Sequence, residues 1–181
     1  MQQCRHEGVI LGFDFGTVRL GVAVGNGLVR EARPLAILDS RTVKARWASI
    51  ERVMKEWEPE VCVVGLPRHP DGVPHEMTAR ALRFARQLEG RYPGVAVYMV
   101  DERYSSVEVE AGAGRDEHID DAAAAVILQQ AFDGGEESLW PVQALSIQTP
   151  QSEQPAADDE HQYDQQSEAP KAVLLCNGKE I

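Results

Sequence analysis

Two apolar runs near the start of the sequence, joined by a short polar turn, limit the possible folds more than any other feature of the chain. The first run, residues 9–13, ends at Asp14, and a Gly-Thr turn and Arg19 lead into the second run, residues 20–24. Runs joined so closely are typical of two paired strands. A buried carboxylate without a partner is costly, so Asp14 is exposed at an edge, paired with Arg19, or bound to a cation.

The remainder of the first 133 residues alternates strand and helix patterns. The predicted elements are strands over 8–14, 20–25, 28–38, 61–66 and 95–100 and helices over 47–57, 76–89 and 121–132, with a short helix around Val107 and Val109. Pro34 favours a sheet edge or a bulge in the third strand, and Asp39 or Ser40 is expected to cap the next helix.

This order of elements predicts an α/β fold with a mixed five-stranded sheet. Three antiparallel strands come first, and two parallel crossover units follow, with helices on both faces of the sheet. The last helix, residues 121–132, is rich in alanine, so we expect it to pack closely on the sheet.

The last quarter of the chain differs in composition. Residues 136–170 are rich in Gln, Glu, Ser, Pro, Asp and Ala, which favours disorder, and an apolar patch follows at 172–175. We therefore expect one domain over 1–135 and an acidic, disordered tail over 136–181. Residues 134–181 carry −7 of the net charge of −11, so the charge of the folded part does not exclude a nucleic-acid partner.

Bulk features favour a cytoplasmic protein. The sequence has no apolar run long enough to cross a membrane, and its first residues lack the apolar core of a signal peptide. The three cysteines, Cys4, Cys62 and Cys176, are far apart and offer neither a disulfide framework nor a zinc spacing.

Acidic residues from three parts of the chain are expected at one edge of the sheet. Asp14 ends the first strand, Asp101 and Glu102 follow a later strand, and Asp120 and Asp121 open the alanine-rich helix. The carboxyl ends of parallel strands share an edge, where open α/β sheets bind ligands. Converging carboxylates repel one another unless a cation or a proton offsets their charge. Magnesium prefers such oxygen ligands and promotes phosphodiester hydrolysis, so the pattern indicates an enzyme acting on phosphates.

Each acidic position also has an ordinary structural explanation. Asp14 is a common turn former, and Asp120 and Asp121 suit the cap and first turn of a helix. The Asp101-Glu102-Arg103 stretch also fits an exposed, salt-bridged loop. From the residues alone these alternatives stay open.

The sequence resembles the YqgF/RuvX proteins over roughly residues 8–135. The motifs that carry the resemblance are, in chain order, Phe13-Asp14-Phe15-Gly16-Thr17, Arg19-Leu20-Gly21-Val22-Ala23-Val24-Gly25, Arg33-Pro34-Leu35, Val64-Gly65-Leu66-Pro67, Asp71-Gly72, Asp101-Glu102-Arg103 and Ile119-Asp120-Asp121-Ala122-Ala123. The resemblance implies an RNase H-like fold related to the RuvC resolvases. It also implies a bacterial cytoplasmic nuclease of the pre-16S rRNA processing or Holliday junction resolvase type.

By position, the resemblance implies that Asp14, Glu102 and Asp120 are catalytic and bind metal, with Mg²⁺ as the cofactor and Mn²⁺ as an alternative. Arg19 and Arg103 stand at the family's motif arginines. Together with an arginine stripe on the helix 76–89, this gives the expected nucleic-acid contacts, which are Thr17, Arg19, Arg68, Arg80, Arg83 and Arg103. The expected partners are pre-rRNA or branched DNA, and ribosomal particles, with no membrane and a monomer or weak homodimer.

The leading hypothesis is a metal-dependent nuclease in 5′-end processing of pre-16S rRNA, with water as the nucleophile. The alternatives are a Holliday junction resolvase acting on branched DNA and a non-catalytic module that binds nucleic acid or the ribosome. The Asp-Phe-Gly-Thr motif also resembles the phosphate motif of actin-like ATPases and sugar kinases. Those proteins need two such domains around a cleft, and about 133 patterned residues are too few for two.

Overall fold

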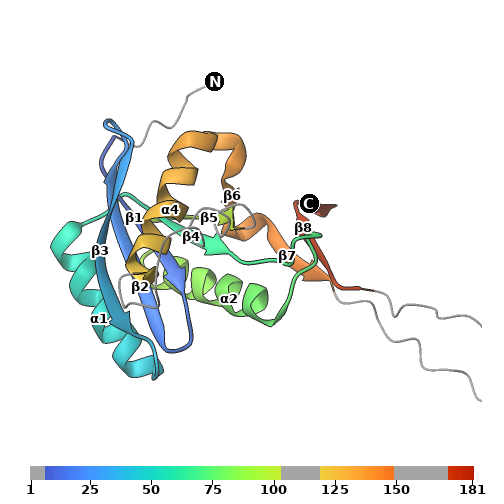
Figure 1. Cartoon of the computed structure of the whole chain (residues 1–181), viewed down its shortest axis with the longest axis horizontal. Coiled ribbons are helices and arrows are strands. Elements are labelled where there is room, and N and C mark those ends of the chain that lie inside the picture. The colour runs from blue at the N-terminus through green and yellow to red at the C-terminus, as the bar shows by residue number, and fades with distance from the viewer. Residues whose placement is uncertain (1–6, 103–118, 149–170) are drawn as a thin grey trace, which may run out of the picture.

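The computed structural model describes residues 7–102, 119–148 and 171–181. The short helix expected around Val107 and Val109 lies outside these residues. Figure 1 shows a central sheet with helices on both sides and a smaller sheet formed by the C-terminal strands.

The predicted hairpin and third strand are confirmed. Strand β1 (Val9–Phe15) pairs antiparallel with β2 (Arg19–Asn26), and β2 pairs antiparallel with β3 (Glu31–Asp39). The β2–β3 register shifts opposite Pro34, and β3 lies at the edge of the sheet. Proline cannot donate a hydrogen bond to the ladder, so both the edge and the bulge accommodate it.

Two parallel crossovers complete the sheet as the alternating pattern predicts. The elements are α1 (Val43–Trp57), β4 (Val61–Leu66), α2 (Glu76–Arg91), β5 (Ala96–Asp101) and α4 (Ile119–Gly134). β4 pairs parallel with β1 and with β5. The sheet has six strands in the order β3-β2-β1-β4-β5-β6, one more than expected, because β6 (Trp140–Pro141) pairs antiparallel with β5.

The expectation of a disordered tail over 136–181 is wrong at both ends of that stretch. The short elements there are η1 (Glu136–Ser138), β6, η2 (Val142–Ala144), β7 (Leu145–Gln148), β8 (Val173–Cys176) and β9 (Lys179–Glu180). β8 pairs antiparallel with both β7 and β9. Leu145 and Leu174 are only 2% and 1% exposed, so burial of these apolar positions overrides the polar average composition. Residues 149–170 lie outside the described part of the chain.

The two faces of the main sheet have separate cores. On one face α1 and α2 pack on the sheet, where the ring centroid of Phe84 lies 5.9 Å from Phe13, 5.0 Å from Phe15 and 5.6 Å from Trp47. On the other face α4 packs on the sheet through residues such as Ile127 and Leu128. Figure 1 shows α4 crossing this second face. Side chains on β1 therefore alternate between the two cores.

The cap of α1 differs from the expected Asp39 or Ser40. The N-cap is Thr42, whose hydroxyl accepts a hydrogen bond from the amide of Ala45 at 3.1 Å. Ser40 is buried, and its hydroxyl and carbonyl oxygens accept hydrogen bonds from the Arg46 guanidinium at 2.8 and 3.1 Å. The serine thus ties the start of α1 to the end of β3. Among the described residues, no helix is long and apolar enough to cross a membrane.

Close packing of α4 on the sheet depends on Gly12. A Cβ atom at Gly12 would lie 2.8 Å from the Cβ of Leu128 and 3.2 Å from the carbonyl oxygen of Ala124. Neither atom can move by rotation of a side chain, so α4 itself would have to move away from β1. The expected close packing of the alanine-rich helix is confirmed.

We expect Gly12→Ala to lower the free energy of unfolding by about 1–3 kcal/mol, because overpacking forces the helix and sheet apart. Urea denaturation measures the change. Gly90→Ala is the matched control, since nothing lies within 4 Å of its added Cβ and alanine favours a helix. Equal effects of the two substitutions would contradict the packing argument.

Candidate metal and nucleic-acid site

Asp14 lies on the α4 face of the sheet at the carboxyl end of β1. Along β1, Ile10 and Gly12 face α4 and Phe13 faces the other core, so strand alternation also directs Asp14 to the α4 side. The side chain is partly buried. It borders an open hollow of about 250 Å³ that is also lined by Gly16, Thr17 and Arg19.

The turn that forms this hollow needs Gly16. A Cβ atom there would lie 2.5 Å from the carbonyl oxygen of Arg19, which is too close for any other residue without a backbone shift. The turn holds Thr17 and Arg19 exposed beside Asp14. The hollow therefore presents a carboxylate, a hydroxyl and a guanidinium together.

Glu102 reaches the same face from the end of β5. Its amide donates a hydrogen bond to the Leu66 carbonyl at 3.2 Å, which extends the β4–β5 ladder by one residue. Its carboxylate lies over Gly65, where an added Cβ would be 1.9 Å from Oε1 of Glu102 and 2.6 Å from Cδ1 of Ile127. The absence of a side chain at Gly65 makes the space that this carboxylate fills.

The environment of Glu102 opposes its negative charge. Burial, followed by the charges of Asp14 and Asp101, raises the pKa of Glu102 to about 8. At neutral pH the carboxyl group therefore tends to keep its proton, and a bound cation would favour its release. The structure holds two acidic groups close together at a cost, which is typical of a metal site or a catalytic acid.

Asp101 lies beside Glu102 in sequence but has a different partner. Its Oδ2 atom is 2.5 Å from Nη2 of Arg68, and the two side chains are only 14% and 1% exposed. Adjacent residues in a strand point to opposite faces, so this ion pair lies on the other side of the sheet from the Glu102 carboxylate. The pair leaves Glu102, rather than Asp101, to face Asp14.

The third expected ligand, Asp120, is in the first turn of α4. Its position is one helical turn before Ala124, which packs near Gly12, so the helix backbone begins near the Asp14 end of β1. The side chain of Asp120 lies outside the described part of the structure. Among the described side chains, no three Asp, Glu, His or Cys groups form a metal cluster.

The donor set fits a hard divalent cation. Asp14 and Glu102 supply carboxylate oxygens, which are the preferred ligands of Mg²⁺. Burial, and then the charges of Asp14 and Asp101, raise the pKa of Glu102, and a bound cation would offset both effects. The missing side chain at Gly65 leaves the space that the Glu102 carboxylate occupies.

The expected nucleic-acid residues fall into separate places. Thr17 and Arg19 line the hollow. Arg80 and Arg83 are exposed on α2, which covers the opposite face from α4, and Arg80 pairs with Glu76 at 2.5 Å.

Of the two remaining arginines, only Arg68 is part of the described structure. The side chain of Arg68 is buried against Asp101, so this conformation does not offer it to a phosphate. Arg103 lies outside the described residues.

Reasoning from the sequence missed the role of Gly65. A glycine inside an otherwise apolar strand is a known sign of a close approach, so the signal was present in the 61–66 run. The burial of Arg68 had no comparable signal. One of its partners is the carbonyl of Ile181, which is 113 residues away along the chain.

Comparisons with known proteins agree with this fold. T. thermophilus RuvC in complex with a Holliday junction substrate matches with a TM-score of 0.50 at 21% identity, over 74% of this chain and 99% of that chain. This likeness confirms the expected RNase H-like fold, with a mixed sheet and helices on both faces.

The family model described as "RuvX: Holliday junction resolvase" matches residues 8–134. The chain therefore belongs to the RuvX family and is a nuclease. Proteins of Paraburkholderia phytofirmans and Paraburkholderia xenovorans, each named "Putative pre-16S rRNA nuclease", are 52% and 50% identical to it over 132 residues. Each match covers 71% of this chain and 90% of the relative.

The raised pKa of Glu102 predicts that the metal-free protein loses stability as pH rises. The folded state keeps a proton on Glu102 up to about pH 8, whereas the unfolded state releases it near the ordinary value of 4.5. The folded state thus binds more protons in this window, so the free energy of unfolding falls between about pH 5 and 8. We expect a fall of roughly 2–5 kcal/mol, measured by urea denaturation in the presence of a chelator.

Glu102→Gln should flatten this pH profile, because glutamine does not titrate. Glu56→Gln, at an exposed position of α1, should leave the profile unchanged. If the free energy of unfolding of Glu102→Gln still falls between pH 5 and 8, another titrating group causes the pH dependence.

Proposed function

We propose that this chain is a metal-dependent nuclease that acts in the 5′-end processing of pre-16S rRNA. In this proposal Asp14, Glu102 and Asp120 are the catalytic acids and hold Mg²⁺, with Mn²⁺ as a substitute. The observation that carries it is the Glu102 carboxyl group, held over Gly65 with its pKa raised to about 8 by burial and by Asp14. Buried acids with raised pKa values are common at metal and catalytic sites.

The residues of the hollow would handle the substrate. The Arg19 guanidinium and the Thr17 hydroxyl flank Asp14, so they would bind and orient the phosphate next to the acids. A bound divalent cation supplies Lewis-acid activation of the phosphate and of the attacking water. In its absence, Glu102 keeps a proton at neutral pH.

Arginines outside the hollow would guide the nucleic-acid backbone. Arg80 and Arg83 are exposed on α2, and Arg103 directly follows Glu102 in the sequence. Phosphate contacts by such cations dominate nucleic-acid affinity and are sensitive to salt. Arg80 and Arg83 would contact the nucleic-acid backbone away from the acids, because α2 covers the face of the sheet opposite α4.

The identity of the substrate rests on the relatives. Close relatives are named for pre-16S rRNA, which favours RNA in ribosomal particles and hence the cytoplasm. The family description favours the second candidate, a resolvase that acts on branched DNA. Under either candidate we expect a monomer or weak homodimer.

A cleavage assay tests the proposal. The protein is incubated with a pre-16S rRNA 5′ leader and with a four-way DNA junction, each with Mg²⁺ and with chelator. We expect Mg²⁺-dependent cleavage of the RNA and a loss of at least 100-fold in Asp14→Asn, because one ligand charge is removed. Undiminished cleavage by Asp14→Asn would overturn the assignment, and preferential cleavage of the junction would select the second candidate.

Gly65→Ala provides a test of the space that Glu102 fills. The added Cβ would overlap Oε1 of Glu102, so we expect the carboxylate to be displaced and cleavage to fall at least tenfold. Circular dichroism should show that the variant remains folded. Gly94→Ala, where the new Cβ meets nothing within 4 Å, should retain full activity. Full activity in Gly65→Ala would count against Glu102 as a ligand.

A further inference from the structure

One buried arginine joins four parts of the chain behind the candidate site. Arg68 follows β4, and its Nη2 atom pairs with Asp101 of β5 at 2.5 Å. Its Nη1 atom donates to the Ile181 carbonyl at 2.7 Å and, less closely, to the Gly72 carbonyl at 3.4 Å. The guanidinium also lies 5.2 Å from the ring centroid of Trp140 on β6.

The C-terminal segment 171–181 is held firmly enough to act as a support for Arg68. Leu174 of β8 is 1% exposed and packs in the same core as Leu145. The amide of Ile181 donates to the Leu174 carbonyl at 3.1 Å, which fixes the carbonyl that Arg68 uses. On the other side, Arg86 of α2 donates to the Leu145 carbonyl at 2.7 Å. This segment lies outside the family match at 8–134 but is built into the domain core.

The Arg68–Asp101 pair fixes the backbone that carries Glu102. Asp101 is the last residue of β5 and Glu102 follows it, so the orientation of one determines the face to which the other points. The Glu102 amide is in turn bonded to Leu66, two residues before Arg68. A shift of Arg68 would therefore move both attachments of Glu102 together.

We propose that Arg68 is a positioning residue for Glu102 and that segment 171–181 is a functional part of the site that acts through it. This inference rests on the proposed nuclease function, because it assigns Glu102 to the metal. Removing one partner of a buried ion pair leaves an uncompensated charge, so disturbance at either end of this chain of contacts is passed on to the other. The C-terminal segment thus contributes to catalysis without touching the substrate.

Steady-state kinetics separate positioning from substrate binding. Arg68→Gln should lower kcat at least tenfold with KM changed less than twofold, because the acids are misplaced and the substrate surface is intact. Arg83→Gln, on the exposed face of α2, should raise KM and leave kcat nearly unchanged. Arg68→Lys should recover part of kcat, since lysine keeps the charge toward Asp101 but lacks the forked geometry. A raised KM with normal kcat in Arg68→Gln would make Arg68 a substrate contact and overturn the proposal.

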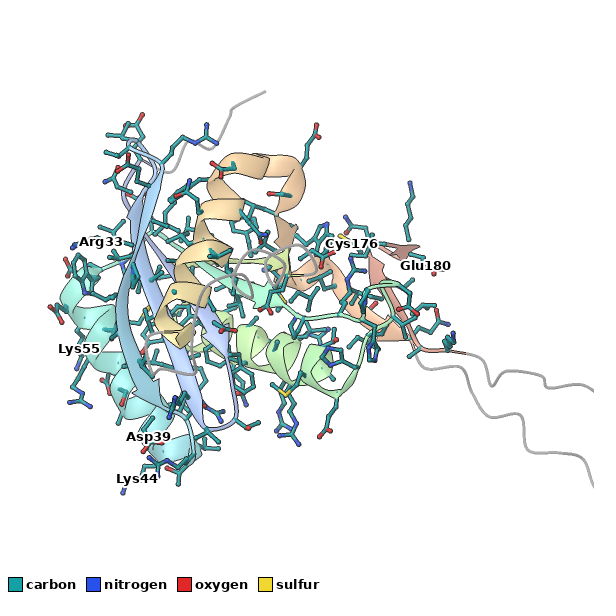
Figure 2. All side chains as sticks on the ribbon, viewed as in Figure 1. Arg33, Asp39, Lys44, Lys55, Cys176 and Glu180 are labelled. Carbon is teal, nitrogen blue, oxygen red and sulfur yellow. The ribbon has the colours of Figure 1, made fainter. Side chains whose placement is uncertain are left out.

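Two measurements without substrate test the connection itself. In the metal-free protein, Asp101→Asn should speed the hydrogen exchange of backbone amides in 171–181 at least fivefold. Calorimetric titration with Mn²⁺ should show three- to tenfold weaker binding in Leu174→Ala. Ile50→Ala is the matched control, because it opens a cavity in α1 without reaching Arg68 and should leave Mn²⁺ affinity unchanged. Figure 2 shows Lys55 on α1 and Cys176 on β8 at opposite ends of the molecule.

The outcomes distinguish this inference from the proposed function. If the wild-type protein binds Mn²⁺ in a manner that depends on Glu102, while Leu174→Ala binds it equally well, the inference is overturned and the metal site stands. If the wild-type protein does not bind Mn²⁺, the proposed metal site is overturned. The proposed role of Arg68 in positioning Glu102 for that metal is then overturned as well. Unchanged exchange of 171–181 in Asp101→Asn would disprove the connection regardless of metal.

Discussion

The repulsion between two carboxylates at the edge of the sheet is the constraint on which the site depends. Asp14 and Glu102 come from the ends of the strands on either side of β4. Burial first, and the charge of Asp14 second, raise the pKa of Glu102 and so oppose its negative charge. Packing of α4 on the same face offsets this unfavourable effect. Gly12 lets α4 approach the sheet, and Gly65 leaves room for the Glu102 carboxylate, because neither has a side chain. The glycines on β1 and β4 therefore serve the fold and the chemistry at once.

The sheet separates these tasks between its two faces. The face under α1 and α2 carries the aromatic cluster around Phe84 and the larger of the two cores. The α4 face has a smaller core and carries the acids. Arg68 and Asp101 lie on the side of the sheet away from the Glu102 carboxylate, where their buried ion pair links the end of β4 to β5. A small domain can in this way tolerate an unfavourable charge arrangement on one face while the other remains conventionally packed.

Much of the fold was predictable because its patterns are local. The hairpin, the two crossovers and the alanine-rich helix follow from runs of apolar residues and from chain order. The strand ends place Asp14 and the Asp101-Glu102 pair, whereas the choice of Glu102 over Asp101 came from the family resemblance. The strands β6 and β8 were not predictable in this way, because segments of two and four residues gain stability only from distant partners. Arg68 was likewise expected to be exposed as a nucleic-acid contact. Its partners Asp101 and Ile181, which are distant along the chain, hold it in the interior.

The order of elements along the chain has a consequence for synthesis. Asp14 and Glu102 leave the ribosome well before β8, and the 46 residues from 136 to 181 take roughly 2–9 s to add. During that interval the six-stranded sheet can form only in part, and the buried guanidinium lacks its carbonyl partner from the last segment. The contacts of Arg68 are thus completed only after β1 to β5 have been synthesised.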